Sequence, residues 1–283
     1  MRRDKRFEVQ NHLTSIPERT FVSMQPVDDT PLCRDGKAVI IAMDHGLERG
    51  PTVFESIPER ADPNAVFELA THDAVTGIGV GKGLAETYYP SYADDVALVA
   101  KLNGKTNLVM GDRFAPQNWS VEYAAELGAD AIGYTIYFGS NREADMMETF
   151  GRVQEEARAA ELPLVMWSYP RGQGVNDHDA PEVVAYAARA ALELGADLAK
   201  IKHPGTQEAV EWATTVAGKL PILMSGGATV SDEAFLRDVE SFVNAGGRGL
   251  TVGRNIWQRE NATEILDAIE RIVYEDQTVS DVL

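Results

Sequence analysis

The sequence predicts an α/β fold, a (β/α)8 barrel with an N-terminal extension, and three observations lead to this prediction. Eight short apolar runs rich in β-branched residues alternate with segments of helical periodicity. A local phrase recurs before strands, as Glu126-Leu-Gly-Ala-Asp130, as Glu193-Leu-Gly-Ala-Asp197 and, more loosely, as Asn244-Ala-Gly-Gly247. Its glycine is typical of a helix C-cap from which the chain turns into the next strand. No linker or low-complexity segment interrupts the alternation, so we expect one TIM-barrel domain.

The eight apolar runs are the predicted strands, and their lengths suit buried parallel strands. They are Ala38–Met43, Ala74–Val80, Val96–Leu102, Ala131–Tyr137, Leu164–Tyr169, Leu198–Lys202, Ile222–Ser225 and Gly249–Val252. The predicted helices are Pro63–Ala70, Glu122–Leu127, Glu143–Ala160, Pro181–Leu194, Gln207–Ala217, Asp232–Ala245 and Thr263–Tyr274, with Leu84–Asp94 as the weakest pattern. A doubly wound open sheet is the alternative topology. We expect residues 1–35 to form a polar, proline-punctuated extension and residues 36–283 to form the barrel.

Composition excludes several classes of partner. The 44 acidic residues against 26 basic ones give a net charge of −18, which argues against nucleic acid and anionic membranes as partners. Lysine is scarce, with eight lysines against eighteen arginines. Strong acidity with few lysines indicates a protein adapted to a salt-rich cytoplasm, where salt screens the repulsion between its charges. An acidic enzyme from a mesophile is the alternative. The single Cys33 allows no internal disulfide, and the N-terminus lacks a secretory pattern, so we expect a cytoplasmic protein.

Polar residues gather where the predicted strands end, which is where barrels of this kind carry their chemistry. The clearest signal is a pair of glycine-rich ends, Ser225-Gly226-Gly227 and Gly253-Arg254. Such loops expose backbone N–H groups that bind phosphate, and an arginine adds a charge-assisted contact. Tight turns alone would also require glycines, but both loops carry the pattern where a phosphate site is expected. The sequence therefore predicts a phosphorylated substrate.

Two lysines end the sixth predicted strand. Lys200 closes an apolar run, where a lysine has no structural purpose unless its amine is used, although it could also extend from the strand end into solvent. Lys202 shares its face by the two-residue period and would lie nearer the pocket mouth. Its charge would help to keep Lys200 neutral and nucleophilic. Spacing alone does not decide which of the two is the nucleophile.

Two further strand ends offer acid–base groups. Asp44 follows the first strand, where it serves either in proton transfer or as a helix cap, and the adjacent His45 is expected to be structural. Tyr169 ends the fifth strand and is a competent acid or base when it is held near the reacting carbon. The five histidines show no metal-ligand spacing, and Gly77–Gly83 does not match a dinucleotide fingerprint. We expect neither a metal nor a cofactor.

At these residues the chain resembles the archaeal-type class I fructose-bisphosphate aldolases, which are related to the DeoC and LacD group. The resemblance covers about residues 36–275. It rests on Met43-Asp-His-Gly46, Lys101-Leu-Asn-Gly-Lys-Thr106, Gly133-Tyr-Thr-Ile-Tyr137, Trp167-Ser-Tyr-Pro-Arg-Gly172, Gly195-Ala-Asp-x-x-Lys200, Met224-Ser-Gly-Gly227 and Val252-Gly-Arg-Asn255. In their order along the chain these motifs are highly specific.

The resemblance implies a role for each site residue. Lys200, three residues after Gly-Ala-Asp, corresponds to the Schiff-base lysine, Tyr169 to the acid/base, Asp44 to a group that assists proton transfer, and Trp167 to a residue that lines the pocket. The chain departs from the family where His203-Pro-Gly-Thr206 replaces a Tyr-Thr-Gly-Asp pattern after the sixth strand, which bears on substrate preference. Members of the family assemble as large homo-oligomers, commonly decamers.

We therefore expect a Schiff-base aldolase that cleaves fructose 1,6-bisphosphate without a metal, with Lys202, Ser225–Gly227, Gly253 and Arg254 contacting the substrate. The nearest alternative is 2-amino-3,7-dideoxy-D-threo-hept-6-ulosonate synthase, a transaldol enzyme that shares the Asp-His-Gly, Tyr-Pro-Arg-Gly and lysine positions. Trp167-Ser-Tyr169 and Lys101–Thr106 favour the aldolase. A non-catalytic barrel that binds sugar phosphates is a third interpretation, which would need the phosphate loops but not the lysine.

Overall fold

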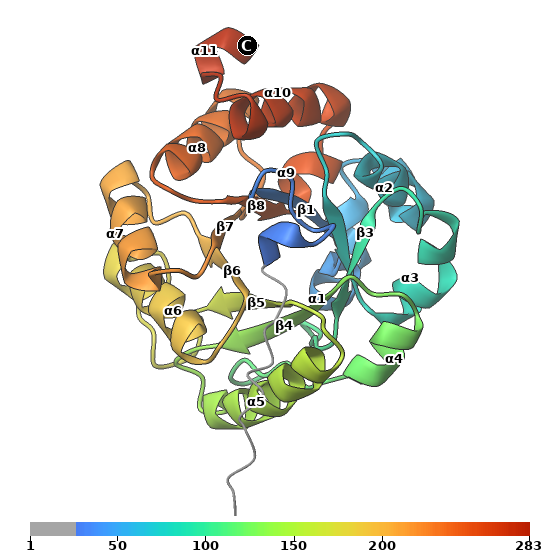
Figure 1. Cartoon of the computed structure of the whole chain (residues 1–283), viewed down its shortest axis with the longest axis vertical. Coiled ribbons are helices and arrows are strands. Elements are labelled where there is room, and N and C mark those ends of the chain that lie inside the picture. The colour runs from blue at the N-terminus through green and yellow to red at the C-terminus, as the bar shows by residue number, and fades with distance from the viewer. Residues whose placement is uncertain (1–26) are drawn as a thin grey trace, which may run out of the picture.

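The computed structural model describes residues 27–283, and in it eight parallel strands form one closed barrel with β8 paired to β1 (Figure 1). The strands are β1 (Ala38–Ala42), β2 (Gly77–Val80), β3 (Ala97–Lys101), β4 (Ala131–Tyr137), β5 (Leu164–Tyr169), β6 (Leu198–Lys202), β7 (Ile222–Ser225) and β8 (Gly249–Val252). The pairing of Ala38 with Gly249 closes the sheet on itself, which excludes the open doubly wound alternative. Gly249 permits this closure, because a Cβ atom there would lie 2.1 Å from the carbonyl oxygen of Ala38.

The helices form a ring around the strands (Figure 1). They are α1 (His45–Arg49), α2 (Pro63–Ala70), α3 (Lys82–Thr87), α4 (Val121–Glu126), α5 (Glu143–Ala159), α6 (Pro181–Glu193), α7 (Gln207–Ala217), α8 (Asp232–Asn244), α9 (Arg254–Trp257), α10 (Ala262–Tyr274) and α11 (Val279–Val282). Short 3-10 turns occupy Val27–Asp29, Pro51–Phe54, Pro58–Ala61 and Tyr89–Ser91. Hydroxyl and carboxylate caps begin several of the helices: the side chains of Asp62, Ser120, Thr206 and Ser231 accept backbone hydrogen bonds at α2, α4, α7 and α8.

The (β/α)8 prediction is confirmed, and the last five strands have the predicted bounds. β2 begins at Gly77 rather than at Ala74, because Val75 N–H donates to the carbonyl of His72 and closes a turn instead of joining the ladder. The weak pattern at Leu84–Asp94 divides into α3 and a 3-10 turn. The short helices α1 and α9, which follow β1 and β8, were not predicted because neither has room for an amphipathic period.

The barrel core has two layers. Alternate strand residues face the surrounding helices, where they build the larger apolar cluster. The others face the barrel interior, where Ile40, Val99, Val165 and Leu223 pack together. Leu32 joins this inner layer, and in Figure 1 the blue segment at the start of the described chain crosses the barrel centre. The predicted extension 1–35 thus packs on the barrel at Leu32, while its residues 1–26 lie outside the described part, so the boundary at residue 35 stays a prediction.

No helix between residues 27 and 283 is long and apolar enough to cross a membrane. Within the same range no group of three His, Cys, Asp or Glu side chains is arranged to hold a metal ion.

Candidate active site

The predicted site residues meet at one end of the barrel because parallel strands all end on the same side. Lys200 comes from β6 and Tyr169 from β5, whereas Asp44 follows β1 and Arg254 follows β8. Charge interactions couple Lys200 with Asp44 and Arg254, and couple Tyr169 with Asp44. Residues spread over the whole described chain therefore form a single site.

Lys200 is an unpaired buried amine. Its side chain is 4% exposed, and its Nζ lies 5.0 Å from the centre of the Trp167 ring without a hydrogen bond or ion pair to any residue in 27–283. Burial lowers the pKa of Lys200 to about 8; Arg171 and Arg254 act in the same direction, and the carboxylates of Asp44 and Glu48 oppose it. The neutral amine is therefore accessible close to neutral pH, as a Schiff-base nucleophile requires.

Lys202 lies farther out than Lys200, as predicted. Its side chain is 27% exposed and forms an ion pair with Asp179. Arg171 and Arg254 are the cations that contribute most to lowering the pKa of Lys200. A contribution from Lys202 to the neutral state of Lys200 remains a prediction.

Trp167 is enclosed in the barrel beneath the two buried lysines. A Cβ atom at Gly133 would lie 2.8 Å from its ring, so the indole occupies space that this glycine leaves open. The Nζ atom of Lys101 lies 5.4 Å from the ring centre, and that of Lys200 lies 5.0 Å from it. The indole thus gives both ammonium groups a favourable aromatic surface.

Asp44 is a half-buried carboxylate within a group of cations. Burial acts to raise its pKa, but His45, Lys101 and Lys200 together hold the pKa below its ordinary value. His45 Nδ1 lies 3.3 Å from the Asp44 carboxylate, and the ring packs edge-on against Trp257. Burial lowers the pKa of His45 to about 4, so the imidazole is neutral at physiological pH. Asp44 is accordingly an ionised acceptor.

Tyr169 is a protonated phenol. Burial raises its pKa well above the usual value; Asp44 and Glu48 add to this effect, and the guanidinium of Arg171, 4.3 Å from the ring, opposes it. Tyr137 stacks on the same ring with 6.4 Å between centroids. A phenol in this state is equipped to donate a proton.

Glu48 is a second, half-buried carboxyl that the sequence did not reveal. It lies on α1, and the hydroxyl of Tyr137 donates to its Oε2 over 3.3 Å. Burial and the charge of Asp44 raise the pKa of Glu48, in contrast to Asp44 itself. Two carboxyl groups whose pKa values move in opposite directions are typical of acid–base sites.

The loops after β7 and β8 border a strongly cationic cavity of about 320 Å³. Arg254 Nη2 donates to the carbonyl of Gly227 over 2.7 Å, which ties the two loops together. Burial and the nearby Arg49 and Arg171 lower the pKa of Arg254, which indicates an excess of positive charge that an anion would neutralise. The charged and imidazole side chains that line the cavity are Arg49, Arg113, Arg171, Lys202, Arg254 and His178.

Of the predicted phosphate-binding residues, only some line this cavity. Gly227, Arg254 and Lys202 do, whereas Ser225 and Gly226 are not among its lining residues. Gly253 has a packing role, because a Cβ atom there would lie 2.6 Å from the carbonyl of Ala42. Contact of Ser225, Gly226 and Gly253 with substrate remains a prediction.

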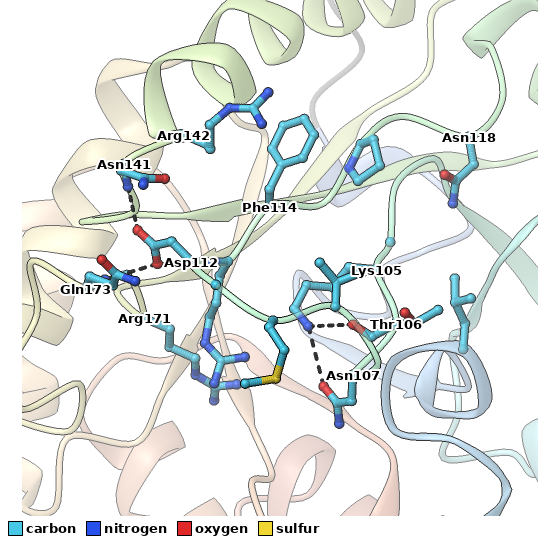
Figure 2. Close-up of a pocket in the computed structure, with 18 residues that line it drawn as sticks. Lys105, Thr106, Asn107, Asp112, Phe114, Asn118, Asn141, Arg142, Arg171 and Gln173 are labelled. Atoms are coloured by element: carbon cyan, nitrogen blue, oxygen red, sulfur yellow. Dashed lines mark hydrogen bonds between the residues drawn. The ribbon is translucent and has the colours of Figure 1, made fainter.

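A larger cavity of about 1090 Å³ adjoins the first one and shares Arg113 and Arg171 with it. Figure 2 shows Lys105 and Arg171 among the residues around it, with Asp112 hydrogen-bonded to the loops on either side. The Asp112 carboxylate accepts from the backbone N–H of Asn141 over 2.6 Å and from that of Gln173 over 3.1 Å. One side chain thus joins the loops that follow β3, β4 and β5.

Sequence reasoning found Arg254 but missed Lys101 and the other arginines of the mouth, Arg49, Arg113 and Arg171. Lys101 ends an apolar buried strand in a lysine-poor chain, which is the same signal that identified Lys200. Arg171 lies two residues after Tyr169 and could have been found by its place at a strand end. Arg49 and Arg113 carry no such signal, since only the folded loops bring them to the mouth.

Comparison with known proteins places this geometry in a family. Residues 38–259 match the DeoC/LacD family aldolase profile. The chain is 54% identical over 260 residues to the class 1 fructose-bisphosphate aldolase of Halobacterium salinarum, covering 92% of this chain and 99% of the relative. It is 47% identical over 251 residues to the class 1 fructose-bisphosphate aldolase of Thermoproteus tenax, covering 88% and 94%.

Solved structures agree with this. An archaeal fructose-1,6-bisphosphate aldolase whose catalytic lysine is covalently bound to the carbinolamine intermediate of the substrate superimposes with a TM-score of 0.81 and 48% identity, over 84% of this chain and 94% of that one. A further structure of an archaeal fructose 1,6-bisphosphate aldolase gives a TM-score of 0.82 at 48% identity, over 85% of this chain and 94% of that one. From its sequence and its fold alike, the chain belongs to the DeoC/LacD family of aldolases.

Proposed function

We propose that the protein is a class I aldolase that reversibly cleaves fructose 1,6-bisphosphate into dihydroxyacetone phosphate and glyceraldehyde 3-phosphate. The observation that carries the proposal is Lys200, a buried amine without a hydrogen-bond partner in residues 27–283 and with a pKa lowered to about 8. Relatives named as class 1 fructose-bisphosphate aldolases and a structure with a covalent lysine intermediate support the same chemistry.

The reaction begins when the neutral Lys200 amine attacks the C2 ketone to give a carbinolamine, which loses water to form an iminium. Ionised Asp44 accepts the proton of the C4 hydroxyl, the C3–C4 bond breaks, and its electron pair moves to the iminium as an enamine. Glyceraldehyde 3-phosphate leaves. Tyr169 donates a proton to C3, the proton held by Asp44 restores the phenol, and water hydrolyses the iminium to release dihydroxyacetone phosphate.

The two cavities supply separate sites for the two phosphates. The smaller one is lined by Arg254, Gly227 and Lys202, and Lys202 comes from the same strand as Lys200, so this cavity suits the phosphate next to the ketone. The larger one, lined by Lys105 and Arg142, suits the distant phosphate. Arg113 and Arg171 line both cavities. Clusters of guanidinium groups are well suited to phosphate oxygens.

Borohydride trapping tests the proposal. Reduction in the presence of dihydroxyacetone phosphate is expected to leave one covalent adduct, on the peptide that contains Lys200, with Lys219→Met as a control at the opposite end of the barrel. The absence of an adduct would favour a non-catalytic sugar-phosphate-binding barrel. An adduct together with the transaldol reaction, but without cleavage of fructose 1,6-bisphosphate, would favour the aminodideoxyheptulosonate synthase alternative.

We also infer a homo-oligomer in a salt-rich cytoplasm. Leu108, Val109 and Met110 form an exposed apolar loop tip, which supports burial against another subunit, and the net charge of −18 supports a saline compartment. Light scattering tests the first inference, which a monomer at every salt concentration would contradict. Thermal unfolding at low and high salt tests the second, which equal stability at every salt concentration would contradict.

A further inference from the structure

The loop between β7 and α8 is held in place by side chains. From Gly226 to Val230 none of its backbone groups bonds to another backbone group in the described part of the chain. Its hydrogen bonds go chiefly to the side chains of Arg254, Asn255 and Arg259, which follow β8. The chemistry proposed above uses Arg254 but neither of the other two.

Asn255 contacts this loop at three points. Its Nδ2 donates to the carbonyl of Gly226 over 2.5 Å and to that of Ala228 over 2.9 Å. Its Oδ1 accepts from the backbone N–H of Val230 over 3.2 Å. The side chain is fully buried, and one amide can make all these bonds because it donates at one end and accepts at the other. The path of the loop therefore depends on the orientation of this amide.

Arg259 fixes that orientation. Its Nη2 donates to Oδ1 of Asn255 and to the carbonyl of Val230, each over 2.9 Å, and its Nε donates to the backbone carbonyl of Asn255 over 2.7 Å. Its Nη1 forms an ion pair with Asp232 in the first turn of α8, and Asp232 also accepts from Asn261 over 2.7 Å. Arg259 is only 6% exposed. The loop is thus tied to one buried network at both of its ends.

Two N–H groups of the loop stay outside this network. The N–H groups of Gly227 and Ala228 donate to no atom of residues 27–283, and both residues line the cationic cavity of about 320 Å³. The φ angle of Gly227 is +65°, a conformation that favours glycine. Successive N–H groups in such a turn form a concave site that binds anions. The network thus binds the carbonyls of the loop and leaves donors beside the cavity.

We propose, on the basis of the function proposed above, that Asn255 and Arg259 are positioning residues for the phosphate next to the ketone. They bind the loop carbonyls and so hold the N–H groups of Gly227 and Ala228 where phosphate oxygens accept from them. Asn255 and Arg259 do not line the cavity themselves. They act through the loop rather than on the substrate.

The proposal predicts that loss of these side chains affects ligands only through their phosphate. Without the Asn255 amide the loop carbonyls lose their donors, so the adjacent N–H groups lose their fixed direction. Dihydroxyacetone phosphate then binds more weakly, whereas dihydroxyacetone, which has the same ketone but no phosphate, binds as before. A residue that merely stabilised the barrel would not distinguish the two ketones.

The test compares the two ketones by borohydride trapping on the full-length protein. In Asn255→Ala we expect the concentration of dihydroxyacetone phosphate for half-maximal adduct to rise about tenfold, as for the loss of one or two hydrogen bonds, with no change for dihydroxyacetone. Arg259→Lys keeps the charge but not the planar fork of donors, so a smaller rise is expected. Arg248→Met is the matched control, because it removes an ion pair with Asp28 at the end of the barrel where the strands begin.

Three outcomes would overturn the proposal. Equal rises for both ketones would give Asn255 and Arg259 a purely structural role. Unchanged values in both variants would show that the loop holds its position without them. Failure of both variants to fold, judged by circular dichroism, would assign the two residues to the stability of the barrel. If only Asn255→Ala fails to fold, Arg259→Lys decides by the same comparison.

Calorimetry with inorganic phosphate separates this proposal from the function on which it rests. Wild-type protein without an adduct at Lys200 would refute the Schiff-base function. Weaker binding of inorganic phosphate in Asn255→Ala than in wild type would still support the role of the loop. Inorganic phosphate that binds equally to both proteins, or to neither, would refute that role.

Discussion

The two sides of the barrel mouth differ in charge and in burial. The side built by β1 to β3 carries Asp44 and Glu48 with the buried Lys101, whereas the side built by β5 to β8 carries the more accessible cations Lys202 and Arg254. The first side suits proton transfer, because burial separates pKa values there. The second suits phosphate, because its guanidinium groups, Arg254 among them, face one cavity. Lys200 lies between them, where both sides set the state of its amine.

The largest expected effect is at this junction. Lys200→Met removes the nucleophile, and we expect kcat to fall on the order of 10⁴-fold, as for the loss of other covalent nucleophiles. The borohydride adduct should also be lost. Lys202→Met, on the same strand, is the control: its adduct should persist while KM rises. An adduct on Lys202 in the Lys200 variant would show that the two lysines exchange roles.

Tyr169→Phe tests the proton-transfer function with the stacked ring retained. We expect kcat to fall by about 10²- to 10⁴-fold, the usual contribution of a general acid or base. The Schiff base should still form, because the amine is intact, so adduct yield and turnover should diverge. Tyr186→Phe, exposed on α6, should change neither quantity. Equal losses of adduct and turnover would instead give Tyr169 a role in binding.

Arg254→Met tests the cationic side. A charge-assisted contact to phosphate is lost, and we expect KM to rise by about 10- to 100-fold with a smaller change in kcat. Arg189→Met, exposed on α6, controls for the loss of an arginine elsewhere. A fall in kcat with constant KM would mean that Arg254 acts in the chemical step, and would contradict the separation of phosphate binding from proton transfer.

The smallest expected effect is at Asp112, which joins the three loops of the larger cavity. Asp112→Asn weakens its bonds to the backbone N–H groups of Asn141 and Gln173. We expect KM for fructose 1,6-bisphosphate to rise about threefold, in keeping with modest losses at a partly solvated hydrogen bond. In the condensation direction, KM for dihydroxyacetone phosphate should stay constant. An equal rise for both substrates would contradict separate phosphate sites.

The sequence predicted the barrel well because strand and helix patterns are local. The predicted start of β2 was wrong, because Val75 is buried but does not pair with a neighbouring strand. Its backbone N–H closes a turn instead. For the site, Lys200, Tyr169 and Asp44 could be located by their positions at strand ends. Lys101 also ends an apolar strand, but it was considered only as part of the Lys101–Thr106 motif.

The remaining site residues could not be predicted from pattern. Arg49 and Arg113 reach the cationic cavity through loops whose course depends on contacts such as those of Asp112. The second charge next to Lys200 was expected from Lys202 on the same strand. Arg171 and Arg254, from other loops, lower the pKa of Lys200, while Lys202 forms an ion pair with Asp179. Such pairings form only in the folded protein, so the spacing of residues along the sequence does not predict them.

The pairing of β1 with β8 has a consequence for the order of events during synthesis. Ala38 pairs with Gly249, so the barrel closes only after almost the whole chain has left the ribosome. Contacts between residues so far apart in sequence are slow to form. Asp44 follows the first strand and Arg254 the last, and both interact with Lys200, so the site is complete only when these two ends of the barrel meet. Activity and barrel closure should therefore appear together during refolding.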